Sequence, residues 1–444
     1  MHSETRRQVV HIAMSGFALL LPWLTWWQAA LCALGALIFN VLALPRLAGE
    51  TMSRPADRSR GYPLGILLYP LSVLLLILAF PARLDIAASA WAIMAWGDGA
   101  ATLAGRAWGR RPLAWNRDKT VEGTLAFLLA ASAGGVLMSW WTAPSIAPTP
   151  LVAFTLLAPL VAAAAAALAE TVPIRLDDNI TVPAIAGAVL WGLSLVDPPS
   201  WQESAPAIWD HLVPALIVNT LAALGGWRAG AVRASGMATG WVIGVVVFTC
   251  AGWQGWALLF AAFMSATLST RLGLKRKAVL GIAEDRGGRR GGGNAFANTG
   301  LAAIAAVLAV TTPFGPLWWL AFVAALTAGG SDTVASEVGK AWGGRTYLVT
   351  TLSEARPGTP GAMSMEGTAA GVVAALVLAS FGAWLGVIPA AWIWVAATGA
   401  IVGSLLESAL AATLEGPGLV NNDVLNFLNT SAGAIAAVVI ARLL

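Results

Sequence analysis

Apolar runs of roughly twenty residues recur along the whole chain, with short polar segments between them. A run of that length can cross the hydrocarbon core of a bilayer as a helix. The pattern therefore predicts an all-α polytopic integral membrane protein with about fifteen transmembrane helices. We expect the spans at residues 9–27, 29–45, 62–80, 86–104, 121–141, 150–169, 180–196, 207–226, 236–250, 253–271, 294–312, 315–331, 366–385, 389–411 and 424–443.

Composition agrees with this pattern. Of the 444 residues only 11% are charged, whereas soluble domains carry about 25%. The first run follows Arg6 and Arg7 without a convincing cleavage site, which indicates a retained helix and not a signal peptide. Cys32 and Cys250 lie in apolar runs, so no disulfide framework is implied. The chain has only three histidines, which argues against a zinc site built from His.

Positive charge predicts the orientation. Arg6 and Arg7 place the N-terminus in the cytoplasm, because cytoplasmic loops are enriched in Lys and Arg. Alternation of the spans then puts 24 of the 26 Lys and Arg inside, and the exceptions are Arg83 and Arg442. We therefore predict a multi-pass protein of a bacterial-type inner membrane, with its active sites on the cytoplasmic side.

An ungapped motif occurs twice. Residues 98–109 read DGAATLAGRAWG and residues 332–343 read DTVASEVGKAWG, which both fit D-x-x-A-x-x-x-G-[RK]-A-W-G. Further along, KTVEGT at 119–124 matches SMEGT at 364–368, and the second half carries an insertion around PGTPG at 357–361.

Later landmarks follow in the same order in both halves. Glu170 and Glu407 each end an apolar span, and each is followed by an Asp/Asn cluster, 177–179 in one half and 421–423 in the other. The predicted topology puts both copies on the same membrane face, which makes them parallel repeats. We expect two transmembrane domains, 1–203 and 204–444.

Helix packing explains only part of the motif. Small residues such as Ala101 and Gly105 allow transmembrane helices to approach closely. They do not explain the recurring acidic residues, which are costly at a membrane and are functional candidates by default. Carboxylates from several segments can hold Mg²⁺, which takes one or two carboxylates plus substrate phosphates. The predicted metal ligands are Asp98, Glu170, Asp177, Asp332, Glu337 and Asp423, and the predicted catalytic residues are Asp98, Lys119, Glu122, Asp332 and Glu366.

Basic residues and glycines near these carboxylates suit phosphate groups. Arginine and lysine neutralise phosphate charge, and glycine lets backbone amides approach phosphate oxygens, although the positive-inside rule explains any single arginine equally well. The chain has no G-x-x-x-x-G-K-[ST] motif, so it is not a P-loop enzyme, and no G-x-S-x-G elbow. The predicted substrate- and nucleotide-binding residues are Gly105, Arg106, Arg110, Thr120, Asp178, Arg289, Arg290, Asn294, Asn298, Lys340, Arg356, Glu407, Asn422 and Asp423.

The first half resembles the phytol kinase and dolichol kinase family, within the wider membrane CTP-transferase group. The segments that carry this resemblance are RRQVVH at the start, GDGAATLAGRAWGRR at 97–111 and WNRDKTVEG at 115–123. The second half resembles the family that includes phytyl-phosphate kinase. Its segments are GGRRGGGNAFANTG at 287–300, GSDTVASEVGK at 330–340, RPGTPGAMSMEGT at 356–368 and NND at 421–423.

These resemblances imply a fusion of two successive isoprenoid-salvage kinases. The first would phosphorylate an isoprenoid alcohol such as phytol from CTP or another NTP, and the second would convert the monophosphate into the diphosphate. A neutral alcohol needs a base or a metal to activate its hydroxyl. An anionic monophosphate needs more positive charge, and a basic cluster that includes Lys277, Arg289 and Arg290 precedes the second motif. Anionic membrane lipids are the alternative partner of that cluster.

The halves differ at one position. Lys119 stands three residues before Glu122, whereas Met363 stands three before Glu366. In the second half the cationic role therefore has to pass to Arg356, Lys340 or the upstream arginines.

Two other functions use similar features. A nucleotidyltransferase that moves CMP onto a lipid phosphate would need the same nucleotide site but would release pyrophosphate instead of CDP. A transporter would also suit many spans and a duplication, yet transport sites lie near the membrane midplane, and the charged motifs here lie at one face. We expect membrane lipids and no nucleic acid as partners. The oligomeric state, the isoprenoid chain length and the donor of each half are left open.

Overall fold

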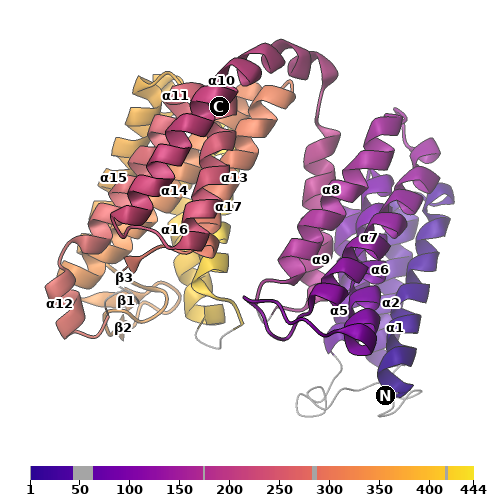
Figure 1. Ribbon diagram of the computed structural model, residues 1–444. Coiled ribbons are helices and arrows are strands. Elements are labelled where there is room, and N and C mark those ends of the chain that lie inside the picture. Colours follow the sequence, from indigo (N-terminus) through magenta and orange to yellow (C-terminus); the bar gives the residue numbers. More distant parts are fainter. Residues whose placement is uncertain (1, 44–63, 174–175, 283–287, 416–418) are drawn as a thin grey trace. The chain divides into compact units, whose positions relative to one another are not determined.

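The computed structural model describes residues 2–43, 64–173, 176–282, 288–415 and 419–444 (Figure 1). The chain divides into two compact units, Met1–Leu195 and Val196–Leu444. The boundary that we predicted at residue 203 lies inside helix α10 (Pro198–Arg228), not in a loop. Gly287, the first residue of the glycine-rich segment, lies outside the described residues.

The first unit is a helical bundle. Its α-helices and 3₁₀ segments are α1 (His2–Met14), η1 (Ser15–Trp23), α2 (Trp26–Leu42), α5 (Leu64–Ala79), α6 (Leu84–Trp108), α7 (Val121–Thr142), η3 (Ala143–Ser145), α8 (Val152–Glu170) and α9 (Asp178–Ser194). The predicted first span is therefore not one continuous α-helix, because α1 ends at Met14 and the chain continues as a 3₁₀ helix that contains Pro22.

The second unit is also mainly helical. Its helices are α10, α11 (Ala234–Arg271), α12 (Leu274–Val279), α13 (Gly292–Thr311), α14 (Gly315–Trp342), α15 (Met365–Trp384), α16 (Ile393–Leu410) and α17 (Asn422–Leu443). Gly252 interrupts α11 with φ 61° and ψ −165°, a conformation that glycine adopts without strain. This break lies between the predicted spans 236–250 and 253–271.

Membrane character is clear from the helices. Eight helices in the described part of the chain are long and apolar enough to cross a membrane. The count of fifteen spans and their orientation remain predictions. The segment 197–206, which separates the predicted spans 180–196 and 207–226, is not a loop, because these residues belong almost entirely to α10. Asp197 caps that helix by accepting from the backbone N–H of Ser200.

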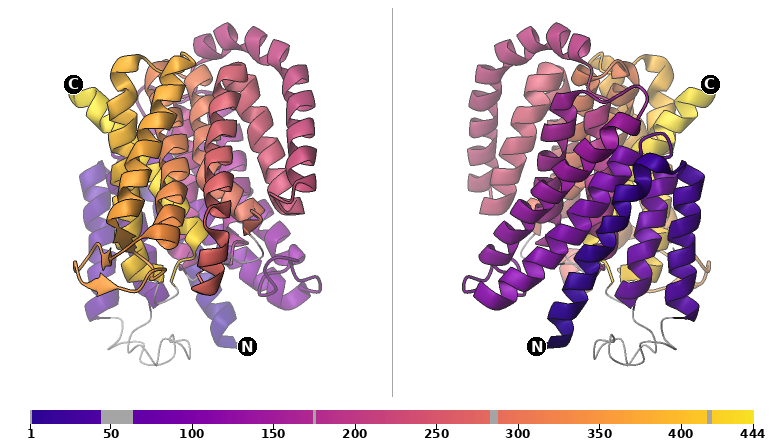
Figure 2. Two further views of the ribbon diagram at one scale, coloured as in Figure 1. Left: turned by 90° about the vertical axis from the view of Figure 1, so that its left-hand side faces the viewer. Right: turned by 90° about the vertical axis from the view of Figure 1, so that its right-hand side faces the viewer.

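The expectation of a purely α-helical chain needs one correction. The insertion before α15 forms a small antiparallel sheet of β1 (Thr346–Leu348), β2 (Glu354–Ala355) and β3 (Ala362–Ser364), in the order β2-β1-β3. Figure 2 shows these strands at one end of the helices of the second unit. The turn glycines Gly358 and Gly361 have positive φ values, 85° and 75°, and short strands joined by such turns have no helical periodicity to reveal them.

Each unit has one central helix that is buried over about three turns. In the first unit this stretch runs from Leu84 to Ala95 of α6, and in the second it runs from Leu320 to Ser331 of α14. Helix α6 packs against α1, α7 and α9, and α14 packs against α13, α15 and α17. A helix that is apolar all round is buried on all sides. Asp98 and Asp332 both follow these buried stretches, so each aspartate sits where the central helix emerges from the core.

Candidate functional site

The loop between α6 and α7 in the first unit is held by backbone hydrogen bonds. The N–H of Leu113 donates to the carbonyl of Lys119, and the N–H of Val121 donates to the carbonyl of Arg111. Oε2 of Glu122 accepts the backbone N–H groups of Arg110 and Arg111 at 3.2 and 3.3 Å. Glu122 therefore stabilises the backbone of this loop. This structural role differs from the catalytic role that we predicted for it.

The motif glycines bring α6 and α7 together. A Cβ atom at Gly123 would lie 3.1 Å from the carbonyl oxygen of Ala101, and one at Gly105 would lie 3.4 Å from Oγ1 of Thr120. Thr120 is the N-cap of α7 and accepts from the N–H of Gly123. The predicted binding residues Gly105 and Thr120 thus act in helix packing and capping, and they place Lys119 immediately beside the crossing.

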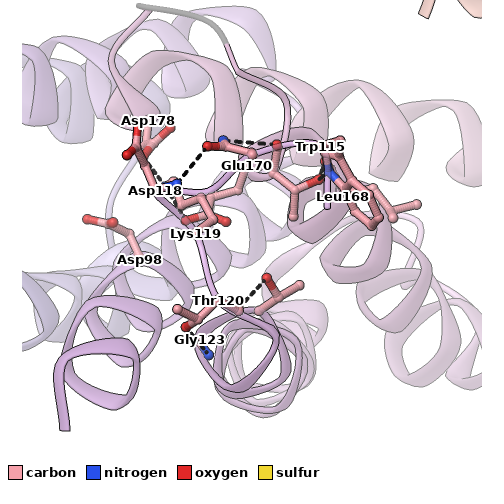
Figure 3. Close-up of polar contacts among 12 residues, drawn as sticks. Asp98, Trp115, Asp118, Lys119, Thr120, Gly123, Leu168, Glu170 and Asp178 are labelled. Atoms are coloured by element: carbon pink, nitrogen blue, oxygen red, sulfur yellow. Dashed lines mark hydrogen bonds and ion pairs between the residues drawn. The ribbon is translucent and has the colours of Figure 1, made fainter. Parts of the chain in front are cut away.

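Lys119 joins two carboxylates that come from different helices. Its Nζ donates to Oε1 of Glu170 at the end of α8 and lies 3.2 Å from Oδ2 of Asp178 at the start of α9 (Figure 3). The side chain of Glu170 is only 3% exposed. Burial by itself would lower the pKa of Lys119, but the charges of Asp178 and Glu170 outweigh it and raise that pKa above its ordinary value. Lys119 is therefore a firmly charged centre of this cluster.

Asp98 faces the same cluster (Figure 3). Its carboxylate lies close enough to Asp178 for the two negative charges to repel one another. On its other side, Oδ2 of Asp98 lies 3.7 Å from Nε2 of His11 in α1. Helix α1 packs closely on α6 at Gly99. A Cβ at this position would overlap the side chain of Ile12 at 2.5 Å, so the close approach requires glycine. Sequence reasoning missed His11, although it lies within the quoted segment RRQVVH.

The second unit repeats the helix crossing. Ser364 is the N-cap of α15 and accepts from the N–H of Gly367. A Cβ at Gly367 would lie 2.6 Å from the carbonyl oxygen of Ala335, and one at Gly339 would lie 3.1 Å from Oγ of Ser364. The carboxylate of Glu366 lies beside Gly344, where a Cβ would be 3.1 Å from Oε1. Glu366 therefore borders the turn after α14, as Glu122 borders the turn after α6.

Asp332 and Glu407 form the acidic centre of the second unit. Oδ1 of Asp332 accepts a hydrogen bond of 2.7 Å from Ser404 in α16. The carboxylates of Asp332 and Glu407 repel one another, and the charge of Lys340 acts favourably on both. Lys340 thus provides the positive charge that Lys119 provides in the first unit. This was one of the alternatives left open by the sequence.

Glu337 lies in a buried ion-pair chain. Its Oε2 accepts from Nζ of Lys277, and its Oε1 accepts from Nζ of Lys340 at 3.0 Å. The side chains of Glu337 and Lys277 are 2% and 1% exposed. Because a lysine contacts each oxygen, these contacts favour an ion-pair role over the metal-ligand role that we predicted. In the sequence Lys277 is one member of a basic run, and nothing local distinguishes it from its exposed neighbours.

A cluster of polar side chains lies where helices α13 and α17 begin. Nη1 of Arg290 donates to Oδ1 of Asn294 at 3.2 Å. A Cβ at Gly293 would lie 2.3 Å from Oδ2 of Asp423, so the carboxylate packs directly on the first turn of α13. Asn298 lies one turn further along α13 and donates to the carbonyl of Asn294. Four predicted binding residues, Arg290, Asn294, Asn298 and Asp423, are thus associated with these two helix starts.

The remaining predicted residues lie at helix caps or on the surface. Asp177 is the N-cap of α9 and accepts from the N–H of Asn179, so its described contact is a capping one. Asn421, not Asn422, caps α17. Five of the predicted binding side chains are exposed: Arg106, Arg110, Arg289, Arg356 and Asn422.

Magnesium fits the acidic pairs in one respect. No group of three or more His, Cys, Asp or Glu side chains suited to a metal occurs in the described part of the chain. Mg²⁺ requires only one or two protein carboxylates when substrate phosphates complete its shell. Two carboxylate pairs repel one another, Asp98 with Asp178 and Asp332 with Glu407. A bound cation would neutralise the negative charge of each pair. Glu170, which we predicted as a metal ligand, forms an ion pair with Lys119.

Comparison with known proteins places the chain in a family. The family described as Integral membrane protein DUF92 matches residues 217–434. An uncharacterized membrane protein of Synechocystis is 39% identical over 249 residues, which cover 54% of this chain and 93% of that protein. The chain belongs to the DUF92 family of integral membrane proteins. The matched residues all lie in the second unit.

Two further relatives carry informative names. Protein VTE6, chloroplastic, of Arabidopsis thaliana is 34% identical over 251 residues, which cover 55% of this chain and 73% of that protein. A phytol kinase of Synechocystis is 35% identical over 203 residues, which cover 43% of this chain and 82% of that protein. No solved structure matches the chain.

Proposed function

We propose that this protein is a membrane-bound, bifunctional isoprenoid kinase built from two fused parallel repeats. The first unit transfers a phosphoryl group from CTP or another NTP to an isoprenoid alcohol such as phytol. The second unit phosphorylates the resulting monophosphate to the diphosphate. Both sites face the cytoplasm, where nucleotides are available, and fusion gives the poorly soluble monophosphate a high effective concentration at the second site.

The observation that carries this proposal is the same arrangement of charges in each unit. In both, an aspartate stands where the buried central helix emerges, Asp98 or Asp332, and repels a second carboxylate, Asp178 or Glu407. A lysine supplies the positive charge, Lys119 in one unit and Lys340 in the other. Phosphoryl transfer requires groups that position the phosphates and stabilise their negative charge. A pair of carboxylates that can hold a metal ion, with a lysine beside it, is suited to both tasks. The name of the phytol kinase relative supports the same chemistry.

The first reaction needs a proton acceptor. The alcohol oxygen forms a bond to the γ-phosphorus while the bond from that phosphorus to the β–γ bridging oxygen breaks, and the nucleoside diphosphate leaves with the electron pair. The imidazole of His11 accepts the hydroxyl proton, and the carboxylate of Asp98, whose Oδ2 lies 3.7 Å from Nε2, stabilises the imidazolium that forms. Magnesium bound by Asp98 and Asp178 would neutralise phosphate charge. Lys119 lies beside these groups and adds positive charge.

The second reaction has no such need. A phosphate monoester is already largely ionised at neutral pH, since its second pKa is about 6, so its oxygen attacks without a base. The second unit accordingly has only His211, whose ring contacts the carbonyl of Thr249 in α11. The contrast between Asp98, which has a histidine beside it, and Asp332, on which the charge of a lysine acts, matches an alcohol followed by a monophosphate.

The decisive experiment uses membranes that contain the protein, γ-labelled CTP and phytol. We expect labelled phytyl monophosphate first and diphosphate later, with CDP as the nucleotide product. Release of pyrophosphate with CMP attached to the lipid would instead identify a nucleotidyltransferase. Absence of any labelled lipid with CTP, ATP, GTP and UTP would overturn the proposal.

A further inference from the structure

A mainly apolar cavity of about 140 Å³ lies within the second unit. Its walls come from α10, α11, α13 and the buried part of α14. Most lining residues are Ala, Gly, Leu, Met or aromatic, and the polar exceptions are few: Asn219, Arg290, Asn294, Asn298 and Thr299. A cavity with an apolar wall and a few polar groups is typical of a small-molecule site.

Three glycines of α11 show the direction in which the cavity extends. Gly236, Gly240 and Gly244 are spaced by four residues and therefore lie on one helix face, and all three line the cavity. A Cβ at Gly236 would lie 2.3 Å from the carbonyl oxygen of Arg290, and one at Gly244 would lie 1.9 Å from Oδ1 of Asn219. A Cβ at Gly240, between them, would meet no atom within 4 Å. The empty space thus extends along α11 from Arg290 to Asn219.

The Arg290 end of the cavity is suited to an anion. Arg290 is half-buried, lies directly before the start of α13 and hydrogen-bonds Asn294 in its first turn. The positive end of the helix dipole and the guanidinium therefore act at the same place. The carboxylate of Asp423 already packs on this first turn, so the guanidinium of Arg290 is the charge that a phosphate in the cavity would meet. A Cβ at Gly329 would lie 3.1 Å from Oδ1 of Asn298. Gly329 precedes Asp332 by one helical turn, so this end of the cavity borders the proposed second active site.

At the opposite end of the cavity, the polar side chain of Asn219 already has hydrogen-bond partners within the protein. Oδ1 of Asn219 accepts from Nε1 of Trp256 at 2.9 Å, and Nδ2 of Asn219 donates to the carbonyl of Ala215 at 2.8 Å. The ring of Trp256 stacks on Phe260. Phe260 lines the cavity and is 43% exposed, so the cavity opens to the surface of the unit on its aromatic side. An apolar chain can enter here without leaving a polar group unpaired.

We infer that this cavity binds the part of an isoprenyl monophosphate nearest its phosphate, with the phosphate beside Arg290 and the remaining chain leaving past Phe260. This inference rests on the proposed second phosphorylation and identifies where its substrate lies. A cavity of about 150 Å³ takes one benzene ring, so this one has room for about one isoprene unit and not for the two chains of a phospholipid. A side chain added at Gly240 would project into this space, because a Cβ there meets no atom within 4 Å.

A photoaffinity probe tests the inference independently of catalysis. The probe is farnesyl monophosphate with a diazirine on the isoprene unit next to the phosphate, and adducts are located by mass spectrometry on the full-length protein. We expect adducts on α11 or α13 at cavity-lining residues. Gly240→Leu should lower this labelling about tenfold or more. A loss of that size corresponds to about 1.4 kcal/mol.

Gly225→Leu is the matched control. Gly225 is also a helical glycine whose Cβ would meet no atom within 4 Å, but it does not line the cavity. Both changes improve helix propensity equally, so a general effect of the added leucine would appear in both. Arg290→Gln should also lower labelling, whereas Arg442→Gln, at an exposed arginine that does not line the cavity, should not.

The outcomes separate this inference from the proposed function. Adducts outside the cavity, or equal labelling of the Gly240 and Gly225 variants, overturn the inference even if the wild-type protein makes diphosphate. Cavity adducts in a protein that transfers no phosphate support the binding site and reject the kinase function. Equal protection by phosphatidic acid vesicles and by unlabelled farnesyl monophosphate would identify a general lipid site and overturn the assignment to an isoprenyl chain.

Discussion

Nε2 of His11 lies 3.7 Å from Oδ2 of Asp98, and this contact joins the N-terminal helix to the central helix of the first unit. The ring of His11 also meets Tyr69 edge-on at 4.6 Å between centroids, and the hydroxyl of Tyr69 donates to the backbone carbonyl of His11. The imidazole is thus held in place from α5 while its Nε2 faces the carboxylate. A positioned imidazole beside a carboxylate is suited to accept a proton.

We predict that His11→Asn lowers the rate of alcohol phosphorylation by about a hundredfold or more, which is the size of a general-base contribution. Conversion of supplied monophosphate to diphosphate should be unchanged, because that nucleophile is already ionised. Val10→Asn is the control, since it places the same asparagine at the adjacent, exposed position of α1. Equal loss of both reactions in His11→Asn would show that the histidine supports the fold and not the chemistry.

Separate active sites make a second prediction. Asp98→Asn should abolish use of the alcohol and leave conversion of supplied monophosphate intact, whereas Asp332→Asn should let monophosphate accumulate. The reason is that each aspartate has its own carboxylate partner and its own lysine. Both steps are followed by separating labelled mono- and diphosphate. If either variant loses both steps, a single composite site is the correct description.

Lys119 should matter for stability as well as for activity. Lys119→Met leaves Glu170, which is 3% exposed, without its partner, and breaking such a pair costs about 3 kcal/mol. Thermal unfolding in detergent measures the loss. The double variant Lys119→Met/Glu170→Gln removes the unpaired charge, so it should recover much of the stability without recovering activity. Full recovery of activity in the double variant would show that Lys119 acts only through the fold.

The raised pKa of Lys119 also predicts a pH dependence. A lysine whose pKa is higher in the folded protein contributes stability that is fully present below its unfolded pKa, about 10.4, and is lost as pH rises through the folded value. The stability difference between wild type and Lys119→Met should therefore be present at about pH 9 and shrink as the pH rises above about 10. A difference that stays the same through that rise would contradict the ion-pair assignment.

The two lysines around Glu337 should behave differently. Lys277→Met should destabilise the second unit by about 3 kcal/mol, because Lys277 and Glu337 are both almost fully buried. Lys340→Met leaves that pair in place and removes the positive charge that acts on Asp332 and Glu407. It should slow diphosphate formation with a smaller effect on unfolding temperature. Equal effects of both changes on unfolding, with activity retained in Lys340→Met, would assign Lys340 a purely structural role.

Local sequence determined the helices and their ends. The apolar runs predicted where helices form, and the segments KTVEGT and SMEGT each contain the cap of the helix that follows, Thr120 and Ser364. The repeated motif identified Asp98 and Asp332 as candidates. These features depend on neighbours within a few residues, through hydrogen bonds and side-chain spacing along one helix, so they can be recognised without knowing the fold.

Only the tertiary structure decided which charged groups meet. His11 reaches Asp98 because Gly99 lets α1 pack against α6, and Lys277 rather than its exposed neighbours is buried against Glu337. The cavity beside Gly240 likewise depends on how α10, α11, α13 and α14 pack. Contacts between segments far apart in sequence depend on crossing positions and on which face of each helix turns inward. A single sequence carries no local signal for either, since an ammonium group looks the same whether packing buries or exposes it.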